Sequence, residues 1–220
     1  MTPTVAIFIP TFNRPVNIKR VVDNIHVNTT GVYRIYFIVE KSDQPTIDAI
    51  NVTGEKIIFN EGRGTYASCI NIAHKQTDEM FFFCGADDLN FHPRWLEEAL
   101  SRMTQGIEVV GTNDLYNPDV LKGTHATHYL VRRTYIKKYS GVIDEPNTVL
   151  YDYDHNYTDT EFIETAKARG CFMSCPASIV EHLHWAWGKA QMDETYQKGN
   201  RNAQQDKRVY EERKHLWLEF

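Results

Sequence analysis

Residues 81–88 read FFFCGADD, a run of three aromatic residues and a cysteine that leads into two adjacent aspartates. A short, wholly apolar run of this kind is typical of a strand buried on both faces of a sheet. Adjacent carboxylates repel each other, and each needs water or a counterion. Mg²⁺ or Mn²⁺ would relieve the repulsion between Asp87 and Asp88, because both ions prefer oxygen ligands. A capping aspartate beside a solvated one is the alternative that the pair leaves open.

The segments on either side of this run alternate between strand and helix patterns. Short strands separated by helices predict an α/β fold with a mostly parallel sheet and helices on both faces. In such sheets ligands bind at the carboxyl ends of the strands. The predicted strands are 4–10, 33–40, 55–60, 79–86 and 107–113. One predicted helix has Pro15 in its first turn, and three others cover 44–51, 64–76 and 92–105.

The second half of the chain has a different character and suggests how the domain is organised. A loop that leads into a strand is predicted over 117–138, a helix over 158–170, and one or two strands over 171–185. We therefore expect one main domain over residues 1–185, divided into halves at residue 113. Residues 186–220 are expected to form a C-terminal extension of loop and polar helix.

Composition limits the class of protein. The net charge of −5 argues against broad adhesion to nucleic acid, which needs a strongly basic surface. Two local basic stretches, RRTYIKK at 132–138 and KRVYEERK at 207–214, are candidate phosphate contacts, although such runs are more often solvated faces. No spacing among the four cysteines matches a zinc site, so buried free thiols are expected.

The sequence contains no apolar run of the ~20 residues that a membrane-spanning helix needs. Residues 1–10 lack a basic leader and stop at a proline, so they are interpreted as a first strand and not as a signal peptide. These observations predict no contact with a membrane and a cytoplasmic location.

Two further loops follow predicted strands and carry groups suited to a nucleotide. PTFNRP at 10–15 offers the side chains of Thr11 and Asn13 to a base or a ribose. NEGRGTYASCIN at 60–71 places two glycines and Arg63 before a helix, where backbone N–H groups favour an anion. Neither a P-loop nor a dinucleotide-binding GxGxxG is present, and a simple helix-entry turn remains the alternative.

Taken in order, PTFNRP, FNEGRGTYASCINIA and GADDL resemble the nucleotide-sugar glycosyltransferases of family 2, which have the GT-A fold. The resemblance covers residues 4–185. GADDLNFHPRWLEEAL and VEHLHWAWGKA further resemble small glycosyltransferases carried by bacteriophages, which would place the protein in the host cytoplasm. The resemblance implies transfer of a sugar from a nucleotide-sugar donor, foremost a UDP-sugar, with Mn²⁺ or Mg²⁺ as cofactor.

The resemblance also implies which residues bind the donor. The chain departs from the family in two places: EKSD stands where DDGS is usual, and Gly85 replaces the first aspartate of the metal motif. The residues expected to contact the nucleotide-sugar are Thr11, Asn13, Arg14, Glu40, Asn60, Gly62, Arg63, Asn71, Ala86 and Asp87.

The same resemblance assigns the metal ligands and the catalytic base. Asp87 is the expected metal ligand with Asp88 beside it, and a late histidine joins them, His184 in preference to His182. In YTDTEF, Asp159 matches the family's general base, which takes the acceptor proton and gives inversion at the anomeric carbon. Glu161 is the second candidate for the base. A capping role for Asp159 at its helix start is the structural alternative.

The acceptor stays open at this point. Aromatic residues suited to a sugar ring or a base are Tyr151, Tyr153, Tyr157, Trp185 and Trp187. A hydroxymethylated base in phage DNA and a hydroxyl of a glycan or protein are both compatible with the sequence. Two rival functions are a nucleotidyltransferase, which would release pyrophosphate, and a non-catalytic nucleotide- or carbohydrate-binding module. Nothing in the sequence indicates the oligomeric state.

Overall fold

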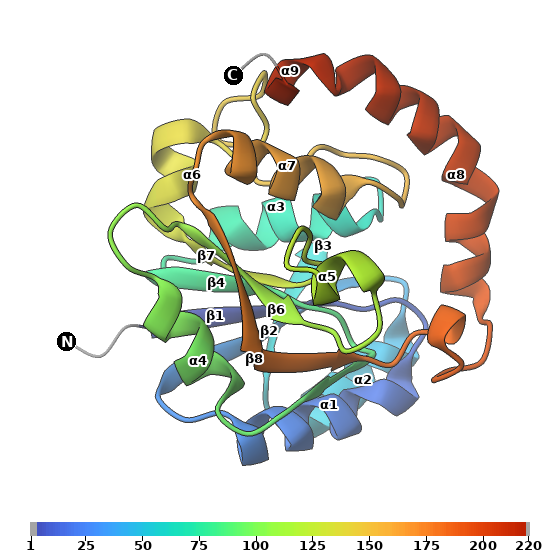
Figure 1. The fold of residues 1–220 in the computed structure, drawn as a ribbon. Coiled ribbons are helices and arrows are strands. Elements are labelled where there is room, and N and C mark those ends of the chain that lie inside the picture. Colours follow the sequence, from blue (N-terminus) through green and yellow to red (C-terminus); the bar gives the residue numbers. More distant parts are fainter. Residues whose placement is uncertain (1–3, 219–220) are drawn as a thin grey trace.

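Eight strands form one mixed sheet in the part of the chain that the computed structural model describes, residues 4–218 (Figure 1). The strand order is β3-β2-β1-β4-β7-β6-β8-β5. The strands are β1 (Thr4–Pro10), β2 (Val32–Glu40), β3 (Lys56–Asn60), β4 (Phe81–Cys84), β5 (Leu89–Phe91), β6 (Val109–Asn113), β7 (Tyr129–Arg132) and β8 (Phe172–His182).

Pairing divides the sheet into a parallel and a mixed part. Strands β3, β2, β1 and β4 are parallel to one another, and β6 is parallel to β8. Strands β7 and β5 run antiparallel to theirs. The predicted α/β class is confirmed, and the parallel half carries the loops that the sequence assigned to the nucleotide.

The helices cover both faces of this sheet. They are α1 (Pro15–Asn28), α2 (Gln44–Thr53), α3 (Tyr66–Gln76), α4 (Trp95–Arg102), α5 (Pro118–Leu121), α6 (Arg133–Tyr139), α7 (Thr158–Ala168), α8 (Glu194–Arg213) and α9 (His215–Leu218), with a 3₁₀ turn η1 at Trp185–Trp187. Figure 1 shows α1, α2 and α4 on one face and α3, α6 and α7 on the other.

Alternation along β1 explains the two cores. Val5, Ile7 and Ile9 point toward the α1, α2 and α4 side, whereas Ala6 and Phe8 point toward the α3, α6 and α7 side. All five side chains are fully buried. Because side chains alternate along a strand and both faces are covered, the strands must be apolar throughout, as the sequence indicated.

Strand β5 is short but positions the site. Its three residues pair antiparallel with β8, and Leu89 lies opposite His182. This register places His182 beside Asp88, the residue that precedes β5. The sequence did not predict β5, because three residues are too few to show a periodic pattern.

The C-terminal extension forms a polar helix, α8, as predicted, and Figure 1 shows it along one side of the molecule between the end of β8 and the α7 layer. Its start is tied to the parallel half of the sheet through Asp193 and Tyr196. In its middle, the buried carboxylate of Asp206 accepts hydrogen bonds from the backbone N–H groups of residues 154–156. At its end, Arg213 pairs with Glu161 of α7.

We expect Arg213→Met to detach the end of α8 and to lower the free energy of unfolding by about 3–5 kcal/mol, the usual cost of leaving one partner of a buried ion pair alone. Arg213 donates to Glu161 at 2.8 and 2.9 Å, and Glu161 is 2% exposed. Urea unfolding measures the loss. The matched control is Arg208→Met, whose exposed pair with Glu212 should contribute under about 1 kcal/mol. Equal losses in both variants would contradict the assignment.

Two further expectations concern the whole chain. The four cysteines are buried thiols that form no disulfide, as the sequence predicted. Within residues 4–218, no helix combines the length and the apolar character that crossing a bilayer requires.

Candidate active site

An open cavity of about 600 Å³ lies at the carboxyl ends of the parallel strands, where the sequence placed the ligand. Its volume is in the range of cavities that hold small ligands and cofactors. The lining contains ten of the residues predicted for the site: Thr11, Arg14, Glu40, Asn60, Ala86, Asp87, Asp88, Asp159, His182 and His184.

Five other predicted residues are not part of the lining, and four of them have structural partners instead. Asn13 donates its backbone N–H to Asp43, and the side chain of Asn71 bonds the backbone of residues 149–150. Arg63 pairs with the carboxylates of Asp152 and Asp154. Glu161 is held by Arg213 and by the hydroxyl of Tyr153. Gly62 belongs to the turn after β3, where its backbone N–H donates to Oδ1 of Asn60.

The nucleotide end of the cavity is formed by the loops after β1, β2 and β3. Asn60 shapes the third loop, because its side-chain oxygen Oδ1 accepts from the backbone N–H of Gly62 at 2.9 Å. Gly64 has φ +68°, a conformation that favours glycine, and a Cβ there would collide with the carboxylate of Glu40. Glu40 is therefore packed directly against the glycine turn at the rim of the cavity.

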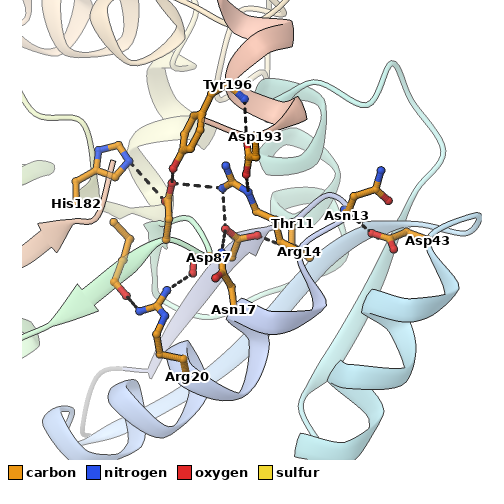
Figure 2. A network of polar contacts seen from close by, with 12 residues as sticks. Thr11, Asn13, Arg14, Asn17, Arg20, Asp43, Asp87, His182, Asp193 and Tyr196 are labelled. Atoms are coloured by element: carbon orange, nitrogen blue, oxygen red, sulfur yellow. Dashed lines mark hydrogen bonds and ion pairs between the residues drawn. The ribbon is translucent and has the colours of Figure 1, made fainter. Parts of the chain in front are cut away.

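Asp87 is a structural anchor in this geometry. Its carboxylate accepts hydrogen bonds from Thr11 at 2.6 Å, Arg14 at 2.9 Å and Asn17 at 3.2 Å, and the residue is 1% exposed (Figure 2). Arg20 also donates to the Asp87 backbone carbonyl. Burial and the adjacent Asp88 raise the pKa of Asp87, while Arg14 and Thr11 oppose that shift. Both carboxylate oxygens are occupied by protein donors.

Asp88, the next residue, has one oxygen left open. Its Oδ2 accepts from the hydroxyl of Tyr196 at 2.6 Å and from Arg14 at 3.3 Å. Its Oδ1 is buried and makes no hydrogen bond to the described residues, and it forms an ion pair with Nε2 of His182 at 3.5 Å. Burial acts to raise the pKa of Asp88, but His182 and Arg14 outweigh it and hold that pKa below its usual range. The sequence expectation favoured Asp87, whereas this geometry favours Asp88 as the carboxylate available to a ligand.

The spacing of Asp88 and His182 suits a cation. Two ligands that each lie about 2.1 Å from an ion, at right angles, are about 3 Å apart, close to the observed 3.5 Å. His184 fits less well than expected, since its Nδ1 accepts from the backbone N–H of Ala186. No three His, Cys, Asp or Glu side chains of the described residues converge as a complete metal site. A cation here would need further oxygen ligands from a substrate.

Arg14 links the acidic pair to the C-terminal helix. Its Nε donates to Asp193 at 2.7 Å, and its guanidinium lies 4.5 Å from the centre of the Tyr196 ring. Figure 2 shows Asp193 and Tyr196 reaching this group from the start of α8. Burial acts to lower the pKa of Arg14, but Asp193, Asp87 and Asp88 raise it, so the group stays charged. Its Nη2 is buried without a hydrogen-bond partner among the described residues.

Asp159 also lines the cavity and lies in the first turn of α7. Its Oδ1 accepts from the N–H of Thr160 at 2.8 Å, and its Oδ2 lies 3.3 Å from Nε2 of His125. Burial acts to raise the pKa of Asp159, but the contact with His125 outweighs burial and lowers it. The carboxylate is therefore an anion that remains 28% exposed toward the cavity.

Several lining residues were not predicted. Tyr196 and its neighbour Asp193 had no sequence signal, because Tyr196 meets Asp88 across 108 residues of chain. His125 and His128 line the cavity beside Asp159, and the close spacing of two histidines in THATH at 124–128 was the one available hint. Among the aromatic candidates for the acceptor, Tyr157 and Trp187 line the cavity, whereas Tyr151, Tyr153 and Trp185 do not.

The fold and this cavity define an α/β enzyme of the GT-A type. The sequence model described as "Glycosyl transferase family 2" matches residues 6–190, most of the chain. The protein therefore belongs to Glycosyl transferase family 2, and the predicted enzyme class is confirmed.

Solved structures agree with this placement. Glucosyl-3-phosphoglycerate synthase from Mycobacterium tuberculosis in complex with Mn²⁺, UDP-glucose and phosphoglyceric acid has a TM-score of 0.64 and 12% identity, with 82% of this chain and 71% of that chain covered. Its complex with Mn²⁺, UDP and glucosyl-3-phosphoglycerate gives 0.61 and 14%, with 82% and 72% covered. At such identity the likeness establishes the fold alone. No curated protein sequence matches the chain.

Proposed function

We propose that the protein transfers a sugar, with inversion, from a UDP-sugar to a hydroxyl group of a neutral carbohydrate acceptor, with Mn²⁺ or Mg²⁺ as cofactor. The observation that carries this proposal is a pair of buried polar atoms beside the cavity. Among the described residues, Oδ1 of Asp88 and Nη2 of Arg14 are both buried without a hydrogen bond, and Oδ1 has only the longer contact of 3.5 Å with His182. Such atoms are costly unless a ligand satisfies them. The carboxylate oxygen of Asp88 suits a cation, and the guanidinium N–H of Arg14 suits an anion. A metal ion bound to a diphosphate supplies both.

Asp88 and His182 would hold the ion, and diphosphate oxygens would complete its coordination. When bound, the ion neutralises charge that develops on the leaving diphosphate. Arg14 would add its free N–H to the same diphosphate, as guanidinium groups do for phosphate. A similar solved structure holds Mn²⁺ and UDP-glucose, which supports this choice of cofactor and donor.

Asp159 would act as the general base. As the acceptor hydroxyl oxygen attacks the anomeric carbon, its proton passes to the carboxylate of Asp159. The bond between that carbon and the diphosphate oxygen breaks, and its electron pair leaves with UDP. Attack from the face opposite the leaving group inverts the configuration. Glu161 is not proposed for this role, because it is buried under Arg213 and Tyr153.

The charge distribution supports a neutral acceptor over DNA. Arg133 is buried and donates to the backbone carbonyls of Glu79 and His74, and Arg132 pairs with Glu108 at 2.8 Å. Arg213 is used by Glu161. Three of the eight cations in the two basic stretches are therefore occupied by protein partners, which reduces what the stretches offer to a phosphate backbone, on which DNA affinity depends. A hydroxymethylated DNA base, and with it the resemblance to bacteriophage enzymes, stays as the alternative.

An aromatic surface at the rim supports a sugar acceptor. Trp187 lines the cavity, and its ring stacks on Tyr116 with centroids 6.4 Å apart. Aromatic faces of this kind pack against the apolar face of a sugar ring. Asn117, Thr127 and Thr160 line the same cavity and offer polar groups to sugar hydroxyls.

Thermal unfolding with a panel of nucleotide sugars, each with and without Mn²⁺, tests the donor. A UDP-sugar at 100 times its Kd should add about 2.7 kcal/mol, which corresponds to roughly 5–10 °C in Tm for a chain of this size. The shift should need Mn²⁺. A shift with nucleoside triphosphates and release of pyrophosphate would support a nucleotidyltransferase, and binding without any turnover would support a binding module.

UDP release in the presence of candidate acceptors tests the second substrate. Neutral oligosaccharides should stimulate release, and the rate should change little with ionic strength. Stimulation by hydroxymethylated duplex DNA, with a steep loss between 50 and 200 mM salt, would overturn the carbohydrate acceptor and favour DNA.

A further inference from the structure

The histidine beside the proposed base has a defined place in the structure. His125 lies in the loop between α5 and β7, and its imidazole Nε2 is 3.3 Å from Oδ2 of Asp159. Its side chain is 14% exposed, so the pair is largely shielded from solvent. The loop itself is tied down, because Lys167 of α7 donates to the backbone carbonyl of Thr124 and Thr127 donates to Asp114.

We propose that His125 is a positioning residue for Asp159, holding one carboxylate oxygen while the remaining lone pairs of that carboxylate face the cavity. This inference rests on the proposed function for its catalytic consequence. The other oxygen, Oδ1, is fixed by the N–H of Thr160. With one donor on each oxygen, the carboxylate cannot rotate freely, and a fixed orientation is what proton transfer from a bound hydroxyl requires.

The protonation state of His125 sets how strongly Asp159 binds a proton. Burial acts to lower the pKa of His125, but Asp159 outweighs burial and raises it above the usual value. A protonated imidazole stabilises the Asp159 anion and makes it a weaker base. When His125 loses its proton, Asp159 becomes a stronger base, so kcat should rise as pH increases through the His125 titration.

Charged groups on the neighbouring elements also act on the pKa of His125 and on the charge of Asp159. Carboxylates add to the stabilisation of the charged imidazole, whereas cationic groups oppose it. The charged or titratable groups around the pair are Asp114 after β6, Asp119 on α5, Glu164 and Lys167 on α7, His128 before β7 and His182 on β8.

Two substitutions separate positioning from mere packing. His125→Gln keeps an amide N–H near the place of Nε2 but cannot titrate, whereas His125→Ala removes the donor. We expect kcat of His125→Ala to fall about 10–100-fold and that of His125→Gln to stay within about tenfold of the parent. The pH profile of the parent should show an inflection above pH 6.5, and His125→Gln should lack it. His26→Gln is the matched control, because His26 forms an exposed pair with Glu55 at 2.9 Å outside the cavity.

A measurement without substrate keeps the inference independent of the proposed function. In an NMR titration, the His125 midpoint should lie above the usual 6.5 and should fall toward it in Asp159→Asn. An unchanged midpoint, or an inflection that persists in His125→Gln, would overturn the inference. If the parent protein turns over no nucleotide-sugar, the proposed function fails. The NMR midpoint then decides by itself whether His125 and Asp159 interact.

Discussion

Asp159→Asn is expected to lower kcat about 10³-fold, within the range that a general base contributes, while the affinity for the UDP-sugar changes less than about twofold. The substitution removes the basic lone pair but keeps the size and shape of the side chain. An amide oxygen still accepts from the N–H of Thr160, so the start of α7 should be preserved. Donor affinity should survive because the hydrogen-bond contacts of Asp159 among the described residues are with His125 and Thr160 and not with Arg14 or Asp88.

Single-turnover kinetics with a saturating acceptor, together with calorimetric titration of the donor, separate these two effects. Asp23→Asn on the exposed face of α1 is the matched control and should leave both quantities unchanged. If Asp159→Asn lost donor affinity and kept kcat, the residue would belong to the donor site and not to the base.

Asp88→Asn and Asp87→Asn should have opposite consequences, although the two residues are adjacent. Asp88→Asn removes the open oxygen beside His182 and should weaken Mn²⁺ binding in the presence of UDP by at least about 100-fold, since even indirect contacts to a metal contribute 10–100-fold. Activity should fall in parallel and recover in part at high Mn²⁺.

Asp87→Asn should leave Mn²⁺ affinity within several-fold and instead destabilise the protein by about 3–5 kcal/mol, because it breaks a buried ion pair with Arg14. Calorimetric titration of Mn²⁺ and urea unfolding of both variants measure the two quantities. If Asp87→Asn lost the metal and Asp88→Asn retained it, the sequence-based choice of Asp87 would be supported and the choice of Asp88 would be wrong.

The contrast between Asp87 and Asp88 shows which features of the site could be predicted from the sequence and which could not. The apolar run at 81–84 predicts the buried strand β4, and the strand predicts where the acidic pair lies. Which carboxylate stays open depends on Thr11, Arg14 and Asn17, which surround Asp87 from β1 and α1. The two residues have the same chemistry, so their separate roles follow from tertiary contacts alone.

Other differences have the same origin. Asn71 matches a family position, yet its amide fits the backbone of residues 149–150, which lies nearly 80 residues away in the chain. His182 reaches Asp88 through the register of β5 with β8, a pairing between segments about 90 residues apart. Local patterns predicted elements and loops well, whereas long-range pairings decided which side chains meet in the cavity.

Helix α8 has a consequence for the variation that this protein tolerates. Tyr196 and Arg213 lie on one helix, about 26 Å apart at 1.5 Å per residue, and each must meet a fixed partner, Asp88 or Glu161. Inserting or deleting one residue between them would turn one anchor by about 100° relative to the other. Many side chains between the anchors are exposed and free to be substituted. Relatives that keep both anchors should therefore differ in the composition of this helix but not in its length.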